Sequence, residues 1–277
     1  MSESWVLTLT CADTVGIVAA VSGALAGSDG FILDSQQYAD LETGRFFMRV
    51  VFAGPDARDA IAPVAKGFAM DWSLVASDWR PRVVIAVSKG SHCLNDLLHR
   101  WSIGALRIDP VAVVSNHETL RALAEWHRVP FHHLPVSEQT RTDQEAALLD
   151  FIDGSEADLV VLARYMQVLG PQLVQALAGR CVNIHHSFLP SFKGAQPYHQ
   201  AHARGVKLIG ATAHFVTGEL DEGPIIEQAV ERVDHRATPA ELAAIGRDIE
   251  AQVLARAVGW ISERRVFLNG LRTVVFR

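Results

Sequence analysis

Cysteine is scarce in this 277-residue sequence, and the cysteines that occur form no metal or disulfide motif. The chain has three, Cys11, Cys93 and Cys181, with no CxxC pair and no even-numbered set that would build a disulfide framework. The stretch MSESWVLTLT at the start also lacks the basic and long apolar regions of a secretion signal. These features predict a protein of the reducing cytoplasm.

Long hydrophobic runs and an excess of basic residues are missing as well. No apolar stretch reaches the roughly 18–20 residues that a helix needs to cross a bilayer, so we expect no membrane partner. The formal net charge is −6, whereas nucleic-acid binding favours a basic surface, so we expect no nucleic-acid partner. Hydrophobic residues make up 49% of the chain and charged residues 20%, a balance typical of a soluble globular protein with an ample core.

The spacing of apolar residues differs between two parts of the chain. In residues 1–80, short strand patterns and helical patterns follow one another in the order βαββαβ. The strand patterns are SWVLTLTC, FILDSQQYADL, RFFMRVVFA and DWSLVASD, and the helical patterns are VGIVAAVSGALAGSDG and PDARDAIAPVAKGFAM. This order predicts a ferredoxin-like domain, in which a small antiparallel sheet packs against two helices. The segment WRPR, residues 79–82, is the expected linker.

Residues 81–277 have longer units and predict a different kind of sheet. Five strand patterns are almost continuously apolar and are separated by helical stretches: RVVIAVS, PVAVVSN, FHHLPV, ADLVVLA and CVNIHH. Buried strands that alternate with helices are typical of a parallel sheet covered on both faces. LIGATAHFV and PIIEQAVERV add two strands, a long helix follows, and a short strand pair closes the chain. We therefore predict an α/β protein whose second domain, 81–277, is Rossmann-like with a mostly parallel sheet.

Polar side chains interrupt the apolar pattern in VNIHHSFLPSF, residues 182–192. Asn183 and His185 are two positions apart, so at the end of a strand their side chains point to the same side. Ligands of open α/β sheets bind outside the carboxyl ends of the strands. Asp221 follows in GELDEGP, a loop flanked by glycine and proline between two strands of the same domain. We expect these three side chains to form one site.

An amide, an imidazole and a carboxylate are sufficient for acyl transfer. The amide stabilises a developing oxyanion, the imidazole moves a proton, and the carboxylate holds the imidazole or activates water. A serine nucleophile fits less well, because the sequence has no GxSxG motif and Ser187 simply follows the histidines. Cys181 lies inside the apolar run and fits a small buried side chain better than a nucleophile.

Structural roles are the alternative for the same residues. Asn183 and Asp221 are compatible with turn formation, and His185 with a hydrogen-bonded structural histidine. His186 should point to the opposite face of the strand, and we predict a structural role for it. No HExxH motif supports a metal site, so we predict none. The histidines considered as metal ligands are His185, His199, His202 and His214.

The segment NIHHSFLPSFKGAQPYHQAHARGVKLIGATAHFVTGELDEGPIIEQ resembles the formyltetrahydrofolate-dependent formyltransferase family. Asn183 and His185 match the Asn-x-His pair of the family, and Asp221 matches its aspartate in the LDEGP loop. The stretch ARYMQVL, residues 163–169, resembles the family's folate loop. The resemblance implies a folate pocket formed by this loop and by the VTGELD segment. Its expected residues are Met166, Gln167, Val168, Leu169, Thr217 and Gly218.

The N-terminal domain resembles an ACT regulatory domain through the stretch CADTVGIV. Asp13 and Gly16 occupy the positions of the strand-to-helix turn that binds a small effector in ACT domains. The resemblance implies an amino-acid effector, with glycine and methionine as candidates. ACT domains commonly pair edge to edge, so we also expect a homo-oligomer, either a dimer or a tetramer.

The acceptor of the formyl group differs among members of this family. Family members that formylate glycinamide ribonucleotide have a glycine-rich GNGSN turn after the first strand, whereas this chain has Ser88 to Cys93 with one glycine. Loss of such a phosphate cradle favours water. We therefore predict hydrolysis of 10-formyltetrahydrofolate to formate and tetrahydrofolate, without a cofactor. The alternatives are formyl transfer to an amine such as glycinamide ribonucleotide, a metal-dependent hydrolase, and a catalytically silent sensor of folate and amino acids.

Overall fold

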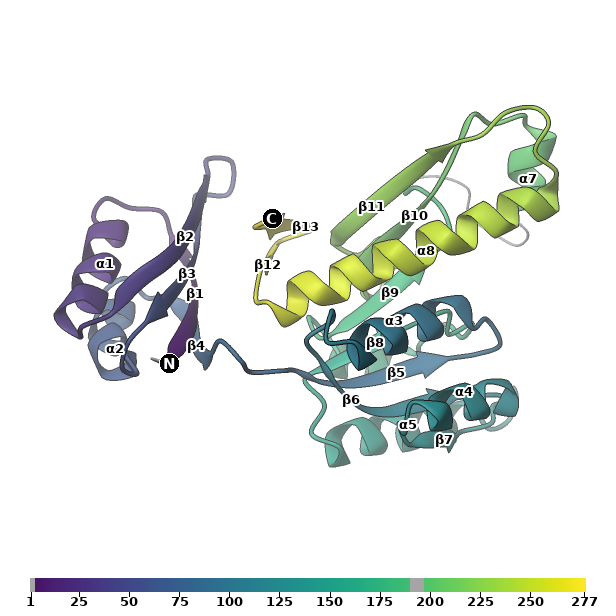
Figure 1. Cartoon of the computed structure of the whole chain (residues 1–277), viewed down its shortest axis with the longest axis horizontal. Helices are drawn as coiled ribbons and strands as arrows, with labels where there is room; N and C mark the ends of the chain where they lie inside the picture. Colours follow the sequence, from purple (N-terminus) through teal and green to yellow (C-terminus); the bar gives the residue numbers. More distant parts are fainter. Residues whose placement is uncertain (1–2, 190–196) are drawn as a thin grey trace. The chain divides into compact units, whose positions relative to one another are not determined.

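The computed structural model describes residues 3–189 and 197–277 (Figure 1). Pro190, in the stretch VNIHHSFLPSF, lies outside the described residues. The chain forms two compact units. One contains Met1–Trp79 together with Glu263–Arg277, and the other contains Arg80–Ser262. The expected limits of 1–80 and 81–277 assigned the last fifteen residues to the second domain, whereas the structure groups them with the first.

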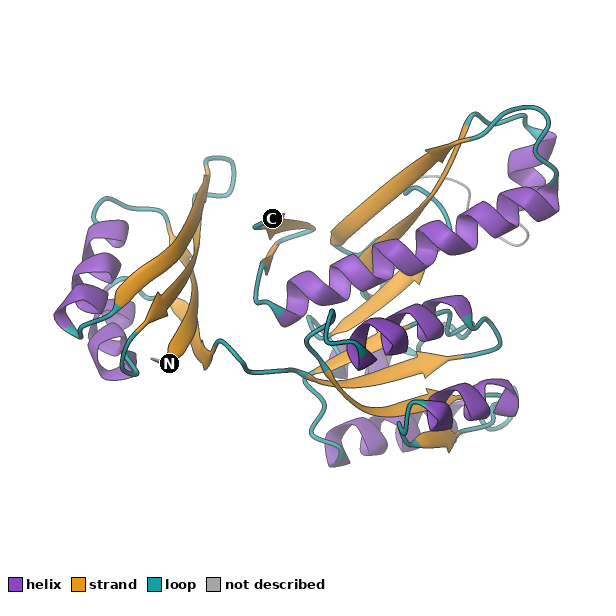
Figure 2. Ribbon diagram, in the orientation of Figure 1, coloured by secondary structure: helices purple, strands orange, loops and turns teal. Residues whose placement is uncertain are grey.

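The first unit is an antiparallel sheet with two helices in the expected βαββαβ order. Its elements are β1 (Ser4–Ala12), α1 (Ile17–Gly27), β2 (Phe31–Asp40), β3 (Arg45–Ala53), α2 (Arg58–Gly67) and β4 (Asp71–Ala76). The strands lie in the order β2-β3-β1-β4, and Figure 2 shows both helices on one side of the sheet. Apolar side chains of this face, such as Leu7, Met48 and Phe52, form a core with Val21 and Ile61 of the helices.

A C-terminal hairpin covers side chains on the other face of this sheet. It consists of β12 (Val266–Asn269) and β13 (Arg272–Val275). Phe47 is fully buried, and its ring meets that of Phe267 at a centroid distance of 5.8 Å. The Nε atom of Arg49 donates to the carbonyl oxygen of Glu263 at 3.1 Å. The continuous apolar pattern of RFFMRVVFA is thus explained, because β3 is buried on both faces.

The second unit contains a seven-stranded sheet that is mostly parallel, as predicted. The strands lie in the order β11-β10-β9-β8-β5-β6-β7. Their limits are β5 (Arg82–Val87), β6 (Asp109–Ser115), β7 (Phe131–His133), β8 (Leu159–Leu162), β9 (Cys181–His185), β10 (Leu208–Phe215) and β11 (Ile225–Arg232). Strands β5 to β9 pair in parallel, and β10 pairs antiparallel with both β9 and β11.

Helices bury both faces of this sheet. They are α3 (His92–Ser102), α4 (Arg121–Trp126), α5 (Arg141–Gly154), α6 (Pro171–Ala176), α7 (Pro197–Ala203) and α8 (Pro239–Ser262), with a short 3-10 turn, η1 (Glu118–Leu120). Val84 and Ala86 of β5 share a core with Leu148 of α5 and Leu173 of α6, and the alternate residue Ile85 is also fully buried. Within the described ranges, no helix is both long enough and apolar enough to span a membrane.

The strand order also fixes where a ligand should bind. Strand β5 has β6 as its neighbour on one side and β8 on the other. The chain forms β6 and β7 on the first side and then crosses back to form β8 and β9 on the second. Neighbouring strands whose connections run in opposite directions leave a crevice at their carboxyl ends, and this crevice is the usual ligand site of such sheets. Ser88 follows β5, and Arg164 follows β8 within two residues. Both residues line the cavities described next.

Candidate active site

Strand pairing brings Asn183 next to His214. The antiparallel register of β9 and β10 places these two residues opposite each other, and Asn183 Nδ2 lies 3.3 Å from His214 Nε2. His214 is buried, and its Nδ1 lies 2.9 Å from the carbonyl oxygen of Phe215. His214 was considered at the sequence level only as a metal ligand. Its place opposite Asn183 follows from the strand register, which the sequence alone does not reveal.

The loop between β10 and β11 places Asp221 against the histidines. Asp221 Oδ2 lies 3.2 Å from His185 Nδ1, and Asp221 Oδ1 lies 3.7 Å from His214 Nε2. Asp221 has a positive φ of 58°, a conformation that few residues other than glycine adopt readily. Burial disfavours its ionisation, but the interactions with His185 and His214 outweigh burial and hold the pKa of Asp221 well below its ordinary value. The site therefore contains an ionised carboxylate.

Gly223 allows this loop to close. Its φ is not in the left-handed region, yet a Cβ atom at this position would lie 1.7 Å from the carbonyl oxygen of Phe215. The backbone N–H of Phe215 donates to the carbonyl oxygen of Pro224 at 2.9 Å. The LDEGP segment thus folds directly onto the end of β10, which fixes the direction of the Asp221 side chain.

The structure corrects the prediction for His186. The rings of His185 and His186 stack, with centroids 4.7 Å apart and planes inclined by 27°. His186 therefore does not point away from His185. Strand β9 ends at His185, and the alternation of side chains does not extend beyond it. His186 lines the same cavity as Asn183 and His185, and an Arg164 guanidinium nitrogen lies 3.0 Å from His186 Nδ1.

A cavity of about 290 Å³ lies over these side chains, and every predicted catalytic and folate-binding residue lines it. These residues are Asn183, His185, Asp221, Met166, Gln167, Val168, Leu169, Thr217 and Gly218. The Met166 and Val168 side chains are exposed, so they offer an apolar surface to a ligand. The nine residues therefore surround one cavity.

Hydrogen bonds anchor the loop at residues 163–169 to its surroundings. The backbone N–H of Met166 donates to Ser88 Oγ at 3.0 Å, and Ser88 Oγ donates to Asn116 Oδ1 at 2.7 Å. Gln144 Nε2 donates to the Tyr165 hydroxyl at 2.9 Å. The loop backbone is thus held by groups that follow β5 and β6 and by α5. Contacts within the protein therefore fix the conformation of this loop.

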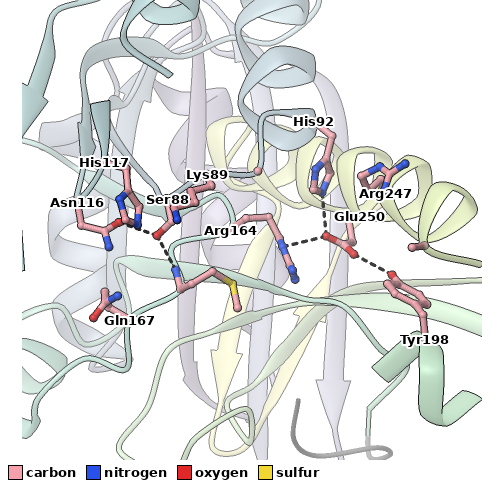
Figure 3. A pocket seen from close by; sticks show the side chains of 13 residues that line it. Ser88, Lys89, His92, Asn116, His117, Arg164, Gln167, Tyr198, Arg247 and Glu250 are labelled. Atoms are coloured by element: carbon pink, nitrogen blue, oxygen red, sulfur yellow. Dashed lines mark hydrogen bonds and ion pairs between the residues drawn. The ribbon is translucent and has the colours of Figure 1, made fainter. Parts of the chain in front are cut away.

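A second cavity of about 510 Å³ shares Arg164, Met166 and Gln167 with the first (Figure 3). The buried carboxylate of Glu250 from α8 lies in its wall. Its oxygens lie 2.8 Å from His92 Nε2, 3.3 Å from Arg164 Nε and 2.9 Å from the Tyr198 hydroxyl. Burial disfavours its ionisation, but the contacts with His92 and Arg164 lower the pKa of Glu250 overall.

Arg164 and Glu250 were missed at the sequence level. A signal for Glu250 existed, because Gly246, Ile249, Glu250 and Val253 are buried together along α8, and a carboxylate on a buried helix face needs a partner. Nothing in the sequence identifies Arg164 as that partner.

The four histidines considered as metal ligands are not part of the one close group of potential ligands found among the described residues. In the part of the chain that the structure describes, the only three potential ligands with atoms within 4.8 Å of one another are His92, Cys93 and Glu250. Burial raises the pKa of the Cys93 thiol well above its ordinary value, which disfavours the thiolate that a metal requires. Arg164 already neutralises the Glu250 carboxylate. The chemistry of this group therefore does not fit a metal ion.

Comparison with known proteins agrees with the fold and identifies the family. A family model described as formyl transferase matches residues 81–258. The formyltetrahydrofolate deformylase of Corynebacterium sp. (strain P-1) is 54% identical, over 98% of this chain and 98% of its own length. A crystal structure of formyltetrahydrofolate deformylase from Burkholderia mallei has a TM-score of 0.96 at 54% identity, and it covers 99% of this chain and 100% of that one.

The second unit is thus a formyl transferase domain. A glycinamide ribonucleotide transformylase from Symbiobacterium toebii matches less of the chain, with a TM-score of 0.68, 30% identity, 72% of this chain and 95% of that one covered. The deformylase relatives match both units, whereas the transformylase leaves about a quarter of the chain unmatched. The chain belongs to the formyltetrahydrofolate deformylases within the formyl transferase family.

Proposed function

We propose that this chain hydrolyses 10-formyltetrahydrofolate to formate and tetrahydrofolate, a reaction of one-carbon metabolism. The observation that carries this proposal is the pairing of His185 with the ionised Asp221 at 3.2 Å, in the wall of a cavity that also contains Asn183. The near full-length identity to formyltetrahydrofolate deformylases supports the same reaction. Besides the folate substrate, the proposed reaction requires water and no cofactor.

The proposed chemistry follows the movement of charge. The oxygen of water attacks the formyl carbon, and negative charge develops on the formyl oxygen. The Asn183 amide and the protonated His185 ring are placed to stabilise that oxyanion. Asp221 holds the His185 ring through Nδ1 and is the base available to the attacking water. The bond between the formyl carbon and N10 then breaks, N10 takes a proton, and formate leaves.

Water rather than an amine is the proposed acceptor. His92 contacts Glu250 at 2.8 Å and, together with Lys89, lines the second cavity beside the site. The turn that contains Lys89 and His92 has one glycine, so it lacks the glycine-rich cradle with which transformylases of the family hold a phosphate. These features argue against formyl transfer to glycinamide ribonucleotide. The assembled Asn183, His185 and Asp221 argue against a catalytically silent sensor.

The reaction can be tested by product analysis. Purified chain is incubated with 10-formyltetrahydrofolate, with and without glycinamide ribonucleotide, and the products are quantified by mass spectrometry. We expect equal amounts of formate and tetrahydrofolate, unchanged by the ribonucleotide and by a chelator. Formylated ribonucleotide formed at a rate comparable to formate would contradict the proposal.

For the first unit we propose an ACT domain that binds an amino acid, glycine or methionine, and that joins copies of the chain. Gly16 has a φ of 98° and directly precedes α1, so the first backbone N–H groups of the helix face outward from the turn that contains Asp13. Strand β2 lies at the edge of its sheet and exposes Phe31, Leu33 and Tyr38, which supports pairing with a second copy. We therefore propose a homo-oligomer, a dimer or a tetramer, in the cytoplasm.

Sedimentation and equilibrium dialysis test these proposals for the first unit. We expect a dimer or a tetramer, with binding of glycine or methionine below millimolar concentration. A monomer at micromolar chain concentration would contradict the assembly, and no binding of either amino acid would contradict the effector site. Neither result bears on the hydrolysis, whose residues all belong to the second unit.

A further inference from the structure

His185 and His186 form a stacked pair in which each ring uses its Nδ1 atom for a specific contact. His185 Nδ1 faces the Asp221 carboxylate at 3.2 Å, and His186 Nδ1 faces an Arg164 guanidinium nitrogen at 3.0 Å. Both Nε2 atoms are buried and have no hydrogen-bond partner among the residues that the structure describes. Buried polar atoms without partners are rare in native proteins and are found at catalytic sites.

The two contacts require different proton positions. A guanidinium can only donate hydrogen bonds, so His186 Nδ1 must be the acceptor and the proton of this ring lies on Nε2. A carboxylate can only accept, so His185 Nδ1 carries a proton. His185 can therefore gain a second proton on Nε2 without losing its contact with Asp221. His186 cannot gain one without losing its contact with Arg164.

Arg164 is itself fixed on its other side. Its Nε atom lies 3.3 Å from the Glu250 carboxylate, which also contacts His92 and the Tyr198 hydroxyl (Figure 3). Gly246 leaves the space for Tyr198, since a Cβ atom there would lie 1.9 Å from the hydroxyl oxygen. The guanidinium is thus bound between a buried carboxylate and the His186 ring.

We propose that His186 is a positioning residue for His185: fixed by Arg164 as the neutral Nε2–H tautomer, it stacks on the His185 ring and stays uncharged while His185 carries the proton. The inference deepens the proposed hydrolysis and rests on it for the role of His185. A second positive charge on a ring stacked at 4.7 Å would disfavour the protonated form of His185.

The charges around His186 agree with a neutral ring. The groups that face it are Arg164 after β8, His185 in β9, Tyr198 in α7, Glu250 in α8 and Asp221 in the β10–β11 loop. Burial, followed by the positive charges of Arg164 and His185, lowers the pKa of His186 to about 4, although Glu250 and Asp221 act in the opposite direction. His186 therefore stays neutral near pH 7.

The tautomer can be measured without activity by NMR of the whole chain labelled with 15N in histidine. We expect the His186 nitrogen shifts of an Nε2–H tautomer, unchanged from pH 8 to pH 5. The exposed His99 of α3 is the reference histidine in the same spectra. An Nδ1–H tautomer, or protonation of His186 between pH 8 and pH 5, would overturn the inference. The spectrum does not depend on whether the chain releases formate.

Kinetics then test the positioning role. We expect His186→Ala to lower kcat by about 10-fold or more, with KM for the folate within about 2-fold of the unmodified chain. His186→Phe should recover part of the loss because its ring can still stack.

Arg164→Met should let His186 take a proton, so the fall of kcat at low pH should begin at a higher pH than in the unmodified chain. The His99→Ala variant is the control. Unchanged kcat and an unchanged pH profile in His186→Ala would overturn the positioning role, whereas an unmodified chain that releases no formate would overturn the proposed function.

Discussion

The Asp221 carboxylate lies 3.2 Å from Nδ1 of His185, and the interactions with His185 and His214 keep it ionised in spite of its burial. The two residues come from different segments, the end of β9 and the loop between β10 and β11. Their contact sets the orientation of the ring that the proposed reaction uses.

Replacement of Asp221 by asparagine should remove activity while the fold is retained. The amide cannot accept a proton from water and does not stabilise a protonated His185, so we expect kcat for formate release to fall by at least about 10²-fold. Circular dichroism should be unchanged because the residue lies in a loop. A variant that retains more than about a tenth of the activity would exclude Asp221 from the chemistry.

Asp221 should also make stability depend on pH in the acid range. Its pKa in the folded chain is below the unfolded value of about 3.9, so its ionised form stabilises the fold above that value. This contribution is lost as the pH falls below about 4 toward the lower folded pKa. The difference in unfolding free energy between the unmodified chain and Asp221→Asn should therefore shrink between pH 5 and pH 3. A difference that stays constant over this interval would contradict the lowered pKa.

Asn183 is expected to act on kcat rather than on folate binding. The loss of one oxyanion donor typically lowers the rate by about 10²–10³-fold, and we expect Asn183→Ala to fall in this range. The folate is proposed to be held by the loop at residues 163–169, so KM should change by less than about 5-fold. Steady-state kinetics separate the two constants. A large rise in KM with an unchanged kcat would make Asn183 a binding residue.

Gly223 offers a test of the loop that carries Asp221. The Cβ atom of Gly223→Ala would lie 1.7 Å from the carbonyl oxygen of Phe215, so the loop must move and Asp221 must leave His185. We expect a large loss of kcat together with a lower midpoint of thermal unfolding. Gly154→Ala is the matched control, because its Cβ atom meets nothing within 4 Å. Equal activity of the two variants would show that the loop tolerates the displacement.

Much of this site was predictable because its signals are local. The apolar strand CVNI, the polar residues directly after it and the spacing of Asn183 and His185 are all read from adjacent positions. The placement of Asp221 was inferred from its loop between two strands of the same domain, and the resemblance of the LDEGP loop to a known family supported it. The strands of both sheets were predicted from their periodicity, which reflects burial of one or both faces.

Contacts between distant segments were not predictable from local patterns. The His186 ring was expected on the opposite face because strand alternation was extended one residue too far, whereas β9 ends at His185. Arg164 and Glu250 meet only because the segment after β8 and the helix α8 come together in the folded unit. The C-terminal hairpin likewise belongs to the first unit because of contacts between residues far apart in the sequence, such as Phe47 and Phe267. The strand pattern RFFMRVVFA contains Phe47 and Arg49, which are buried in the structure. The sequence did not identify the C-terminal hairpin as the segment that covers them.

The Glu250 network can be tested through Gly246 in α8. An exchange of glycine for alanine inside a helix usually stabilises a protein by about 0.5–1 kcal/mol. At Gly246, however, the new Cβ atom would lie 1.9 Å from the Tyr198 hydroxyl oxygen, so Tyr198 must leave Glu250. We expect Gly246→Ala to lower the free energy of unfolding in urea.

Gly259→Ala in the same helix is the matched control, since its nearest neighbour is Leu106 Cδ1 at an ordinary 3.7 Å, and it should be neutral or stabilising. The two variants differ in what the added methyl group meets, because both glycines lie within α8. If Gly246→Ala proved as stable as Gly259→Ala, Tyr198 could move at little cost. The buried Glu250 carboxylate would then be held by His92 and Arg164 alone.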